Sequence, residues 1–180
     1  ASSSQGIALM SEMLFIASGM RLPVVMAVAN RALSSPINIW NDHSDTMAQR
    51  DSGWLQFYCE NAQEAYDTML QAYKISEHKD ILLPSMVCVD GFTLSHLLEP
   101  VQMLNQADAD SFLPAYAPRY KLDTDNPLTM GALAYPDTYM HFKKQQQDAI
   151  INSADIIRKA NSEFEKKFGR SYGNGLIETY

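Results

Sequence analysis

Arg31 is the first residue of this sequence whose type and position suggest chemistry. It closely follows the apolar run 23–29, which is typical of a buried strand. Ligands of open parallel sheets gather beyond the carboxyl ends of the strands, and Arg31 stands at such an end. A guanidinium offers a rigid fork of N–H donors that matches a carboxylate in two parallel hydrogen bonds. The position suggests a carboxylate-binding arginine, and the alternative is a structural ion pair with Asp42 or Asp45.

A cluster of ionisable side chains, Asp42, His43 and Asp45, follows in the next loop. A histidine between two carboxylates could supply nitrogen and oxygen ligands to a metal ion. The other histidines show no matching spacing, and the sequence has no HExxH motif. A Ser-His-Asp hydrolase is weaker still, because no GxSxG motif is present. We therefore expect a hydrogen-bonded loop that forms a wall of the site, with metal ligation as the alternative.

The opening SSSQG stretch places hydroxyls, an amide and a glycine at the start of a helix. Its serines can act as N-caps, and free N–H groups at such an end can also receive an anion or a polar ring. Candidates for the wall of the site are therefore Ser4, Gln5, Gly6, Asn30, Asp42, His43 and Asp45.

The elements that must position these residues are predicted from the apolar patterns. The run 7–18 is apolar on most faces, so we expect a helix buried on more than one side. Asn61 is expected to cap a second helix through residue 78, with Glu64 in the capping-box position and an apolar stripe that includes Met69 and Tyr73. The predicted strands are 24–29, with both faces covered, 53–58 and 81–89. This alternation of helices and strands predicts an α/β fold with a parallel sheet.

The second half of the chain has a different texture. Residues 113–136 carry four prolines and are predicted to form an extended connector. A single long helix is predicted over 137–168, with one apolar stripe on a mostly polar cylinder and Gly169 just past its end. The glycine-rich segment 169–175 lacks the GK of a phosphate-binding loop, so we interpret it as an interdomain hinge.

Composition limits the function further. The 180 residues suit one domain, and the net charge of −7 argues against nucleic acid as the main partner. No apolar run is long enough to span a bilayer. Cys59 and Cys88 are far apart in sequence and fit buried thiols in a reducing cytoplasm, with a disulfide as the less favoured reading.

Taken in order, several stretches resemble the alpha chain of pyruvate:ferredoxin oxidoreductase, a member of the 2-oxoacid:ferredoxin oxidoreductase family. They are SSQG, ANRALSSPINIWNDHSDTMAQRDSGWLQFY, ENAQEAYD, VDGFTLSH, NPLTMGAL and the GRSYG–LIETY ending. The resemblance covers nearly all of the chain. It implies a three-layer α/β/α fold of the thiamine-diphosphate-binding, pyrimidine type, with a long connecting helix.

The resemblance also implies a reaction and a domain division. The reaction is oxidative decarboxylation of pyruvate to acetyl-CoA and carbon dioxide, with electrons passed to ferredoxin, and it can run in reverse as pyruvate synthase. Arg31 would hold the carboxylate of pyruvate. Residues 1–112 would be the C-terminal part of the pyrimidine-type domain, 113–168 the connector and long helix, and 169–180 a hinge and the first strand of a following domain.

Cofactors and partners follow from the same resemblance. Thiamine diphosphate and Mg²⁺ would be shared with a beta chain, while 4Fe–4S clusters and coenzyme A would bind elsewhere in the complex. The partners would be beta, gamma and delta subunits or fused equivalents, ferredoxin and a small 2-oxoacid. We treat the 180 residues as part of a longer polypeptide, without catalytic residues of their own, and expect them to be inactive alone.

Three alternatives remain open at this stage. The same family includes enzymes for other 2-oxoacids, such as oxalate, 2-oxobutyrate and branched-chain oxoacids. The long helix and acidic surface could also belong to a non-catalytic interaction module. A metal-dependent hydrolase built on residues 42–45 is the third, and it requires a bound metal.

Overall fold

The computed structural model describes residues 1–177 and is built on a parallel sheet of three strands. The strands are β1 (Val25–Asn30), β2 (Leu55–Tyr58) and β3 (Ser85–Asp90), in the order β1-β3-β2. Val25 and Leu55 both pair with Ser85, so all three strands begin at one level. Their carboxyl ends therefore meet at one edge, as the sequence pattern predicted.

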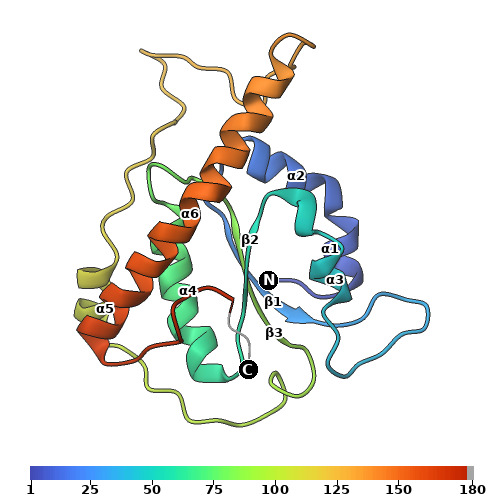
Figure 1. Ribbon diagram of the computed structural model, residues 1–180, viewed down its shortest axis with the longest axis vertical. Helices are drawn as coiled ribbons and strands as arrows, with labels where there is room; N and C mark the ends of the chain where they lie inside the picture. The colour runs from blue at the N-terminus through green and yellow to red at the C-terminus, as the bar shows by residue number, and fades with distance from the viewer. Residues whose placement is uncertain (178–180) are drawn as a thin grey trace.

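Helices cover the two faces of the sheet (Figure 1). On one face, α1 (Gln5–Leu9) and α2 (Ser11–Gly19) share a core cluster with β1 and β3. On the other face, α4 (Ala62–Ser76) and α6 (Tyr139–Phe168) pack over β2 and β3. The predicted three-layer α/β/α architecture is confirmed.

The strand β1 lies at an edge of the sheet, and the prediction that both of its faces are covered is wrong. Val28 is buried against the first pair of helices, whereas Ala27 on the opposite face is exposed. Ser2 pairs with Val28 from the outer side: Ser2 N donates to the Ala27 carbonyl at 3.1 Å, and Ala29 N donates to the Ser2 carbonyl at 3.2 Å. The first residues of the chain thus run beside the strand that ends at Arg31.

The first predicted helix is two helices, because the chain turns at Met10 between α1 and α2. Its apolar side chains are not buried on more than one side within the described residues. Ile7 and Leu14 face the core, whereas Leu9 and Met13 are exposed. Ser4 occupies the N-cap position with φ 45° but makes no side-chain cap bond, which contradicts the expected capping role.

Two short helices connect β1 to β2: α3 (Ser44–Met47) and the 3₁₀ helix η1 (Arg50–Ser52). The cap of α4 is as predicted, since the Asn61 side chain accepts a hydrogen bond from Glu64 N at 2.9 Å. The Glu64 carboxylate accepts from Glu60 N at 2.6 Å, one residue before the position that a capping box uses.

The long helix α6 confirms the prediction for residues 137–168, and it ends at Gly169 with φ 70°. Its buried residues pack on α4 and the sheet, and Phe164 and Phe168 enclose Phe112. Phe112 ends α5 (Gln106–Phe112), a helix that the sequence pattern did not predict. The proline-rich connector 113–136 contains no helix or strand and runs outward before it returns to α6 (Figure 1).

The segment after α6 is held against α4 by a buried carboxylate, Asp67. Arg170 Nε and Nη2 donate to the two Asp67 oxygens at 2.6 and 2.7 Å, and the Tyr172 hydroxyl donates to Asp67 Oδ2 at 2.6 Å. We call Asp67, Arg170 and Tyr172 the α4 clamp. The hydrogen bond to Asp67 raises the pKa of Arg170, and burial raises the pKa of Tyr172, so both keep their protons. The following domain, whose first strand was placed in 169–180, stays a prediction, and residues 178–180 lie outside the described residues.

No helix within residues 1–177 has the length and apolar character that a membrane crossing requires.

Candidate functional site

Arg31 lies directly after β1, at the carboxyl edge of the sheet, where the sequence pattern placed it. Among residues 1–177 its guanidinium forms no ion pair, so neither Asp42 nor Asp45 binds it as a structural partner. Arg31 Nη2 donates to Gln5 Oε1 at 2.8 Å. Arg31 Nε is buried and has no hydrogen-bond partner in the described part of the chain. The arginine therefore keeps unused donor capacity at the sheet edge.

Asp45 is fully buried and organises the backbone around Arg31. Its Oδ2 accepts from Ser4 N at 2.9 Å and from Arg31 N at 3.1 Å. Its Oδ1 accepts from Asn30 Nδ2 and from Thr46 N, each at 2.8 Å. One carboxylate thus ties the start of the chain, the end of β1 and the start of α3 together. The DHSD loop acts on Arg31 through its main chain and not through its side chain.

The SSSQG stretch packs against the loop that follows β1. Ser4 is fully buried, and its hydroxyl donates to the Ala32 carbonyl at 2.6 Å instead of capping α1. A Cβ on Gly6 would stand 2.5 Å from Ser2 Oγ, so the glycine permits this close packing. Gln5 is exposed and contacts both Arg31 and Ser34. The structure therefore brings Ser4, Gln5, Asn30, Arg31 and Asp45 together, with Gly6 behind them.

The other two residues of the cluster face elsewhere. Asp42 Oδ1 accepts from Ser44 N at 2.7 Å, and hydrogen bonds from Ser44 lower the pKa of Asp42. The His43 ring packs edge-on against Tyr58, with ring centroids 5.1 Å apart. Ser44 Oγ accepts from Leu33 N at 3.2 Å, so no Ser-His-Asp relay is formed by the described side chains. Over residues 1–177, no group of three or more His, Cys, Asp or Glu residues could hold a metal ion.

Sequence reasoning missed a layer of side chains beneath the site. The Tyr58 hydroxyl lies 2.9 Å from Thr46 Oγ1 and donates to Gln56 Oε1 at 2.9 Å, while Asn30 Nδ2 donates to Thr46 Oγ1 at 2.8 Å. Burial raises the pKa of Tyr58 to about 12, so the phenol stays protonated at neutral pH. The available signal was the spacing of Gln56 and Tyr58, since residues two apart on a strand share one face.

The loops after β1 and β3 are joined beside the site. Gly91 N donates to the Asn30 carbonyl at 2.9 Å, and a Cβ on Gly91 would stand only 2.0 Å from that oxygen. The absence of a side chain at Gly91 permits this close backbone approach. Phe92 packs edge-on against Trp40, with ring centroids 5.4 Å apart. Both loops therefore share in positioning Asn30, the neighbour of Arg31.

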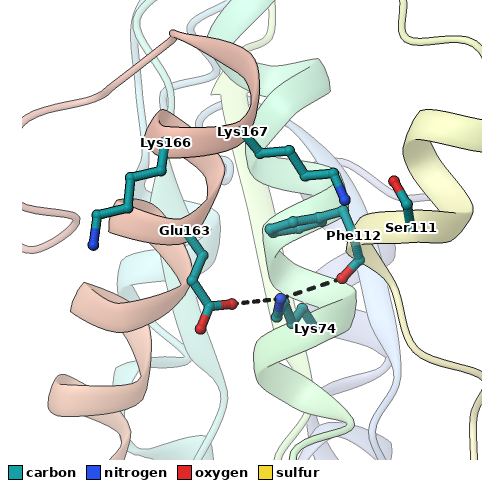
Figure 2. A pocket seen from close by; sticks show the side chains of 6 residues that line it. All are labelled: Lys74, Ser111, Phe112, Glu163, Lys166 and Lys167. Carbon is teal, nitrogen blue, oxygen red and sulfur yellow. Dashed lines mark hydrogen bonds and ion pairs between the residues drawn. The ribbon is translucent and has the colours of Figure 1, made fainter.

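Two hollows lie away from Arg31. The first, of about 360 Å³, lies between α4, α5 and α6, and Figure 2 shows Lys74 on its wall between Glu163 and Phe112. Lys74 Nζ contacts Glu163 at 2.6 Å, donates to the Phe112 carbonyl at 3.2 Å and lies 4.1 Å from the centre of the Phe112 ring. Lys74 is therefore occupied in fastening α5. The second hollow, of about 770 Å³, lies between the end of β2, the start of α4 and residues 172–177.

Comparison with protein families decides the identity of this arrangement. The family model described as "Pyruvate flavodoxin/ferredoxin oxidoreductase, thiamine diP-bdg" matches residues 1–162. The chain belongs to this family. The resemblance found in its sequence is thereby confirmed, and the parallel sheet with its covering helices agrees with the thiamine-diphosphate-binding fold.

Curated relatives place the chain more closely within the pyruvate flavodoxin/ferredoxin oxidoreductase family. It is 56% identical to the pyruvate synthase subunit PorA of Methanocaldococcus jannaschii, over 100% of this chain and 46% of the relative. It is 53% identical to PorA of Pyrococcus furiosus, over 100% of this chain and 45% of the relative. A ketoisovalerate oxidoreductase subunit, VorA of Pyrococcus horikoshii, is 46% identical over 99% of this chain and 45% of its own length. The chain spans about half the length of the curated relatives it matches.

Proposed function

We propose that this chain forms part of the alpha subunit of a pyruvate:ferredoxin oxidoreductase and that Arg31 binds the carboxylate of pyruvate. The observation that carries the proposal is the state of the Arg31 guanidinium. It stands at the carboxyl edge of a parallel sheet with a buried donor, Nε, that has no partner among residues 1–177. Buried donors are normally hydrogen-bonded, so an unpaired one at a site edge favours a ligand.

The structural alternative for Arg31 loses support from the same contacts. A structural ion pair needs a carboxylate, and the nearest buried one, Asp45, is filled by four other donors. These donors include the main-chain N–H of Arg31 itself. Asp45 is therefore a positioning residue in this proposal: it holds the main-chain N–H of Arg31 and leaves the guanidinium available.

The charge of Arg31 suits a substrate that loses its carboxylate. A guanidinium neutralises and orients the carboxylate during binding, and that charge leaves with carbon dioxide. Binding that is equally strong in the ground state and the transition state lowers KM without raising kcat. Arg31 is therefore proposed to select and orient the acid, and the bond cleavage needs other groups.

The cofactor proposed for the full protein is thiamine diphosphate, which supplies, when bound, the nucleophilic carbon and the electron sink for decarboxylation. The residues present fit a role at the substrate end, where Arg31 donates to the exposed side chain of Gln5. They do not include a metal cluster in 1–177. Following the family resemblance, Mg²⁺ is proposed to be shared with a beta chain, and the 4Fe–4S clusters and coenzyme A to bind elsewhere in the complex. Beta, gamma and delta subunits or equivalent domains, and ferredoxin, are the proposed partners.

A second candidate substrate is a branched-chain 2-oxoacid. The observation in its favour is the 46% identity to a ketoisovalerate oxidoreductase subunit over nearly the whole chain. The identities to pyruvate synthase subunits of up to 56% favour pyruvate. A pocket discriminates such acids by the size of the side chain that it admits, so the ratio of kcat/KM for pyruvate and ketoisovalerate separates the two candidates.

The test is pyruvate-dependent reduction of a viologen dye by the assembled full-length complex, with wild type compared to Arg31→Lys. Lysine keeps the charge but loses the two-pronged geometry, so we expect KM for pyruvate to rise by roughly tenfold or more. Arg158→Lys is the matched control, because Arg158 is an exposed arginine of α6 paired with Asp155 at 2.8 Å. An unchanged KM in Arg31→Lys, with intact assembly, would reject the carboxylate role.

A further inference from the structure

The guanidinium of Arg31 has one edge that is half-occupied by another side chain of the protein. This edge is formed by Nε and Nη2. Nη2 donates to the amide oxygen of Gln5 at 2.8 Å, while Nε is buried and without a partner among the described residues. The Nε/Nη2 edge of Arg31 can therefore bind two oxygens, but only one, Gln5 Oε1, is present.

The same chain shows how a carboxylate fills this edge. In the α4 clamp, Arg170 Nε and Nη2 donate to the two oxygens of Asp67 at 2.6 and 2.7 Å. If a carboxylate bound Arg31 in the same way, one oxygen would replace Gln5 Oε1 at Nη2 and the other would accept from Nε. Gln5 therefore occupies half of a carboxylate site.

The side chain of Gln5 is held loosely, although its main chain is fixed. Its neighbour Ser4 is buried and bonded to Asp45, so the start of α1 does not move freely. The Gln5 side chain itself is exposed, and its only other hydrogen bond within the described residues is from Nε2 to Ser34 Oγ at 3.3 Å. Two exposed contacts of an uncharged amide are weaker than a paired bond between a guanidinium and a carboxylate.

We propose that Gln5 is an internal stand-in for the substrate carboxylate. Its amide oxygen occupies Arg31 until a 2-oxoacid binds and displaces it. This inference rests on the proposed function, because it takes Arg31 as the carboxylate-binding group. Binding exchanges the Arg31–Gln5 bond for two parallel bonds to the carboxylate. The amide of Gln5 is released, and its contact with Ser34 in the loop after β1 is released with it.

The exchange has a consequence for affinity. Each binding event includes the cost of breaking the Arg31–Gln5 bond, so the observed Kd is weaker than that of an unoccupied arginine. In return, Gln5 keeps the cation partnered and the arginine in one orientation while the site is empty. Removing the amide therefore strengthens binding, which is the opposite of what a substrate contact or a support for Arg31 predicts.

The experiment is titration calorimetry of pyruvate into the full-length complex, with wild type, Gln5→Ala, Gln5→Glu and Gln147→Ala compared. For Gln5→Ala we expect Kd to fall by roughly three- to tenfold, since a competing bond to a charged group is removed. For Gln5→Glu we expect Kd to rise by about tenfold or more, because a glutamate forms an ion pair with Arg31. Gln147 is an exposed glutamine of α6, and its variant controls for loss of a surface amide.

Each outcome decides between the proposals. A Kd for Gln5→Ala that is unchanged or higher overturns the stand-in role, since Gln5 would then be irrelevant or a support. Pyruvate binding without dye reduction overturns the proposed reaction, while the order of the Kd values still decides the role of Gln5. If pyruvate does not bind but ketoisovalerate does, the same variants are compared with that acid. If neither acid binds to the wild type, both proposals fail.

Discussion

Arg31 and Arg170 each stand beside a fully buried aspartate, yet the two arginines are used in different ways. The two oxygens of Asp67 accept hydrogen bonds from the side chain of Arg170 and from the Tyr172 hydroxyl. The two oxygens of Asp45 accept hydrogen bonds from main-chain N–H groups, including that of Arg31, and from an asparagine side-chain amide. The first aspartate immobilises a guanidinium, and the second fixes only the chain that carries one.

This difference shows how a fold can keep a cation available. A buried carboxylate would normally capture a nearby arginine, since an unpaired buried charge is costly. Hydrogen bonds from main-chain donors satisfy Asp45 instead, so it has no need of the Arg31 side chain. A structural arginine and a ligand-binding arginine are thus distinguished by what else fills the nearest carboxylate.

Among the tests of the difference between Arg170 and Arg31, the largest effect is expected from Asp67→Asn. The change leaves Arg170 facing a neutral amide, and the loss of one partner of a buried pair costs about 3 kcal/mol of unfolding free energy. Urea unfolding of the full-length protein measures it. Asp155→Asn, which removes the exposed partner of Arg158, is the control and is expected to have no measurable effect. Equal stability of the two variants would mean that the α4 clamp is not structural.

Smaller changes in stability, of unequal size, are expected when each of the two arginines is replaced by lysine. Arg170→Lys loses the two parallel bonds to Asp67 and is expected to cost about 1–2 kcal/mol of stability. Arg31→Lys is expected to change stability by less than about 0.5 kcal/mol, because only the exposed contact with Gln5 is lost. Thermal unfolding of both variants checks this. A larger loss in Arg31→Lys than in Arg170→Lys would reverse the assignment of the two arginines.

The smallest effect is expected for the reactivity of two buried thiols, Cys88 beneath the Arg31 site and Cys59 beneath the α4 clamp. Cys88 is buried near Asn30, and Cys59 is buried against α4. Burial raises the pKa of Cys59 to about 12 and raises that of Cys88. Neither thiol is expected to react with a thiol reagent at pH 8 in the folded protein.

The direction of the pH effect follows from the raised pKa. An unfolded thiol titrates at ~8.5, so the stability that neutral Cys59 contributes is complete below that pH and is lost as pH rises toward 12.

In Asp67→Asn we expect faster labelling of Cys59 than of Cys88, detected by mass spectrometry. Equal labelling of both thiols would show that the two regions open together.

The sheet and the long helix could be predicted from the sequence because their patterns are local. The apolar runs before Asn30 and Asp90 have the length and composition of buried strands, and Gly169 marks the end of α6. The exposure of Ala27 on β1 could not be predicted, since a continuous apolar run does not reveal whether the strand is central or at an edge.

The α4 clamp was invisible to the same reasoning. Tyr73 was predicted to lie in the apolar stripe of this helix, and no pattern in the sequence singled out Asp67. In the structure Asp67 is buried and Tyr73 is exposed, because Arg170 and Tyr172 pack on that side of α4. The partners are more than 100 positions away in the chain, and no local pattern records such a contact. For the site, the sequence indicated Arg31 and its neighbours but not that Asp45 binds main-chain groups.

The late position of α6 also affects the order of events during synthesis. Its side chains complete a core cluster whose other members lie before β3 or in α4 and β2: Leu55, Ile75, Ile81 and Leu83. At ~5–20 residues per second, the ribosome delivers Ala160, the last buried α6 member of this cluster, roughly 4–15 s after Leu83. Throughout this interval the part of the cluster that α6 later covers is exposed apolar surface, although α4 can already pack on the same face. Ribosomal pausing within the connector 113–136 would therefore prolong the period in which the growing chain is open to chaperones and to aggregation.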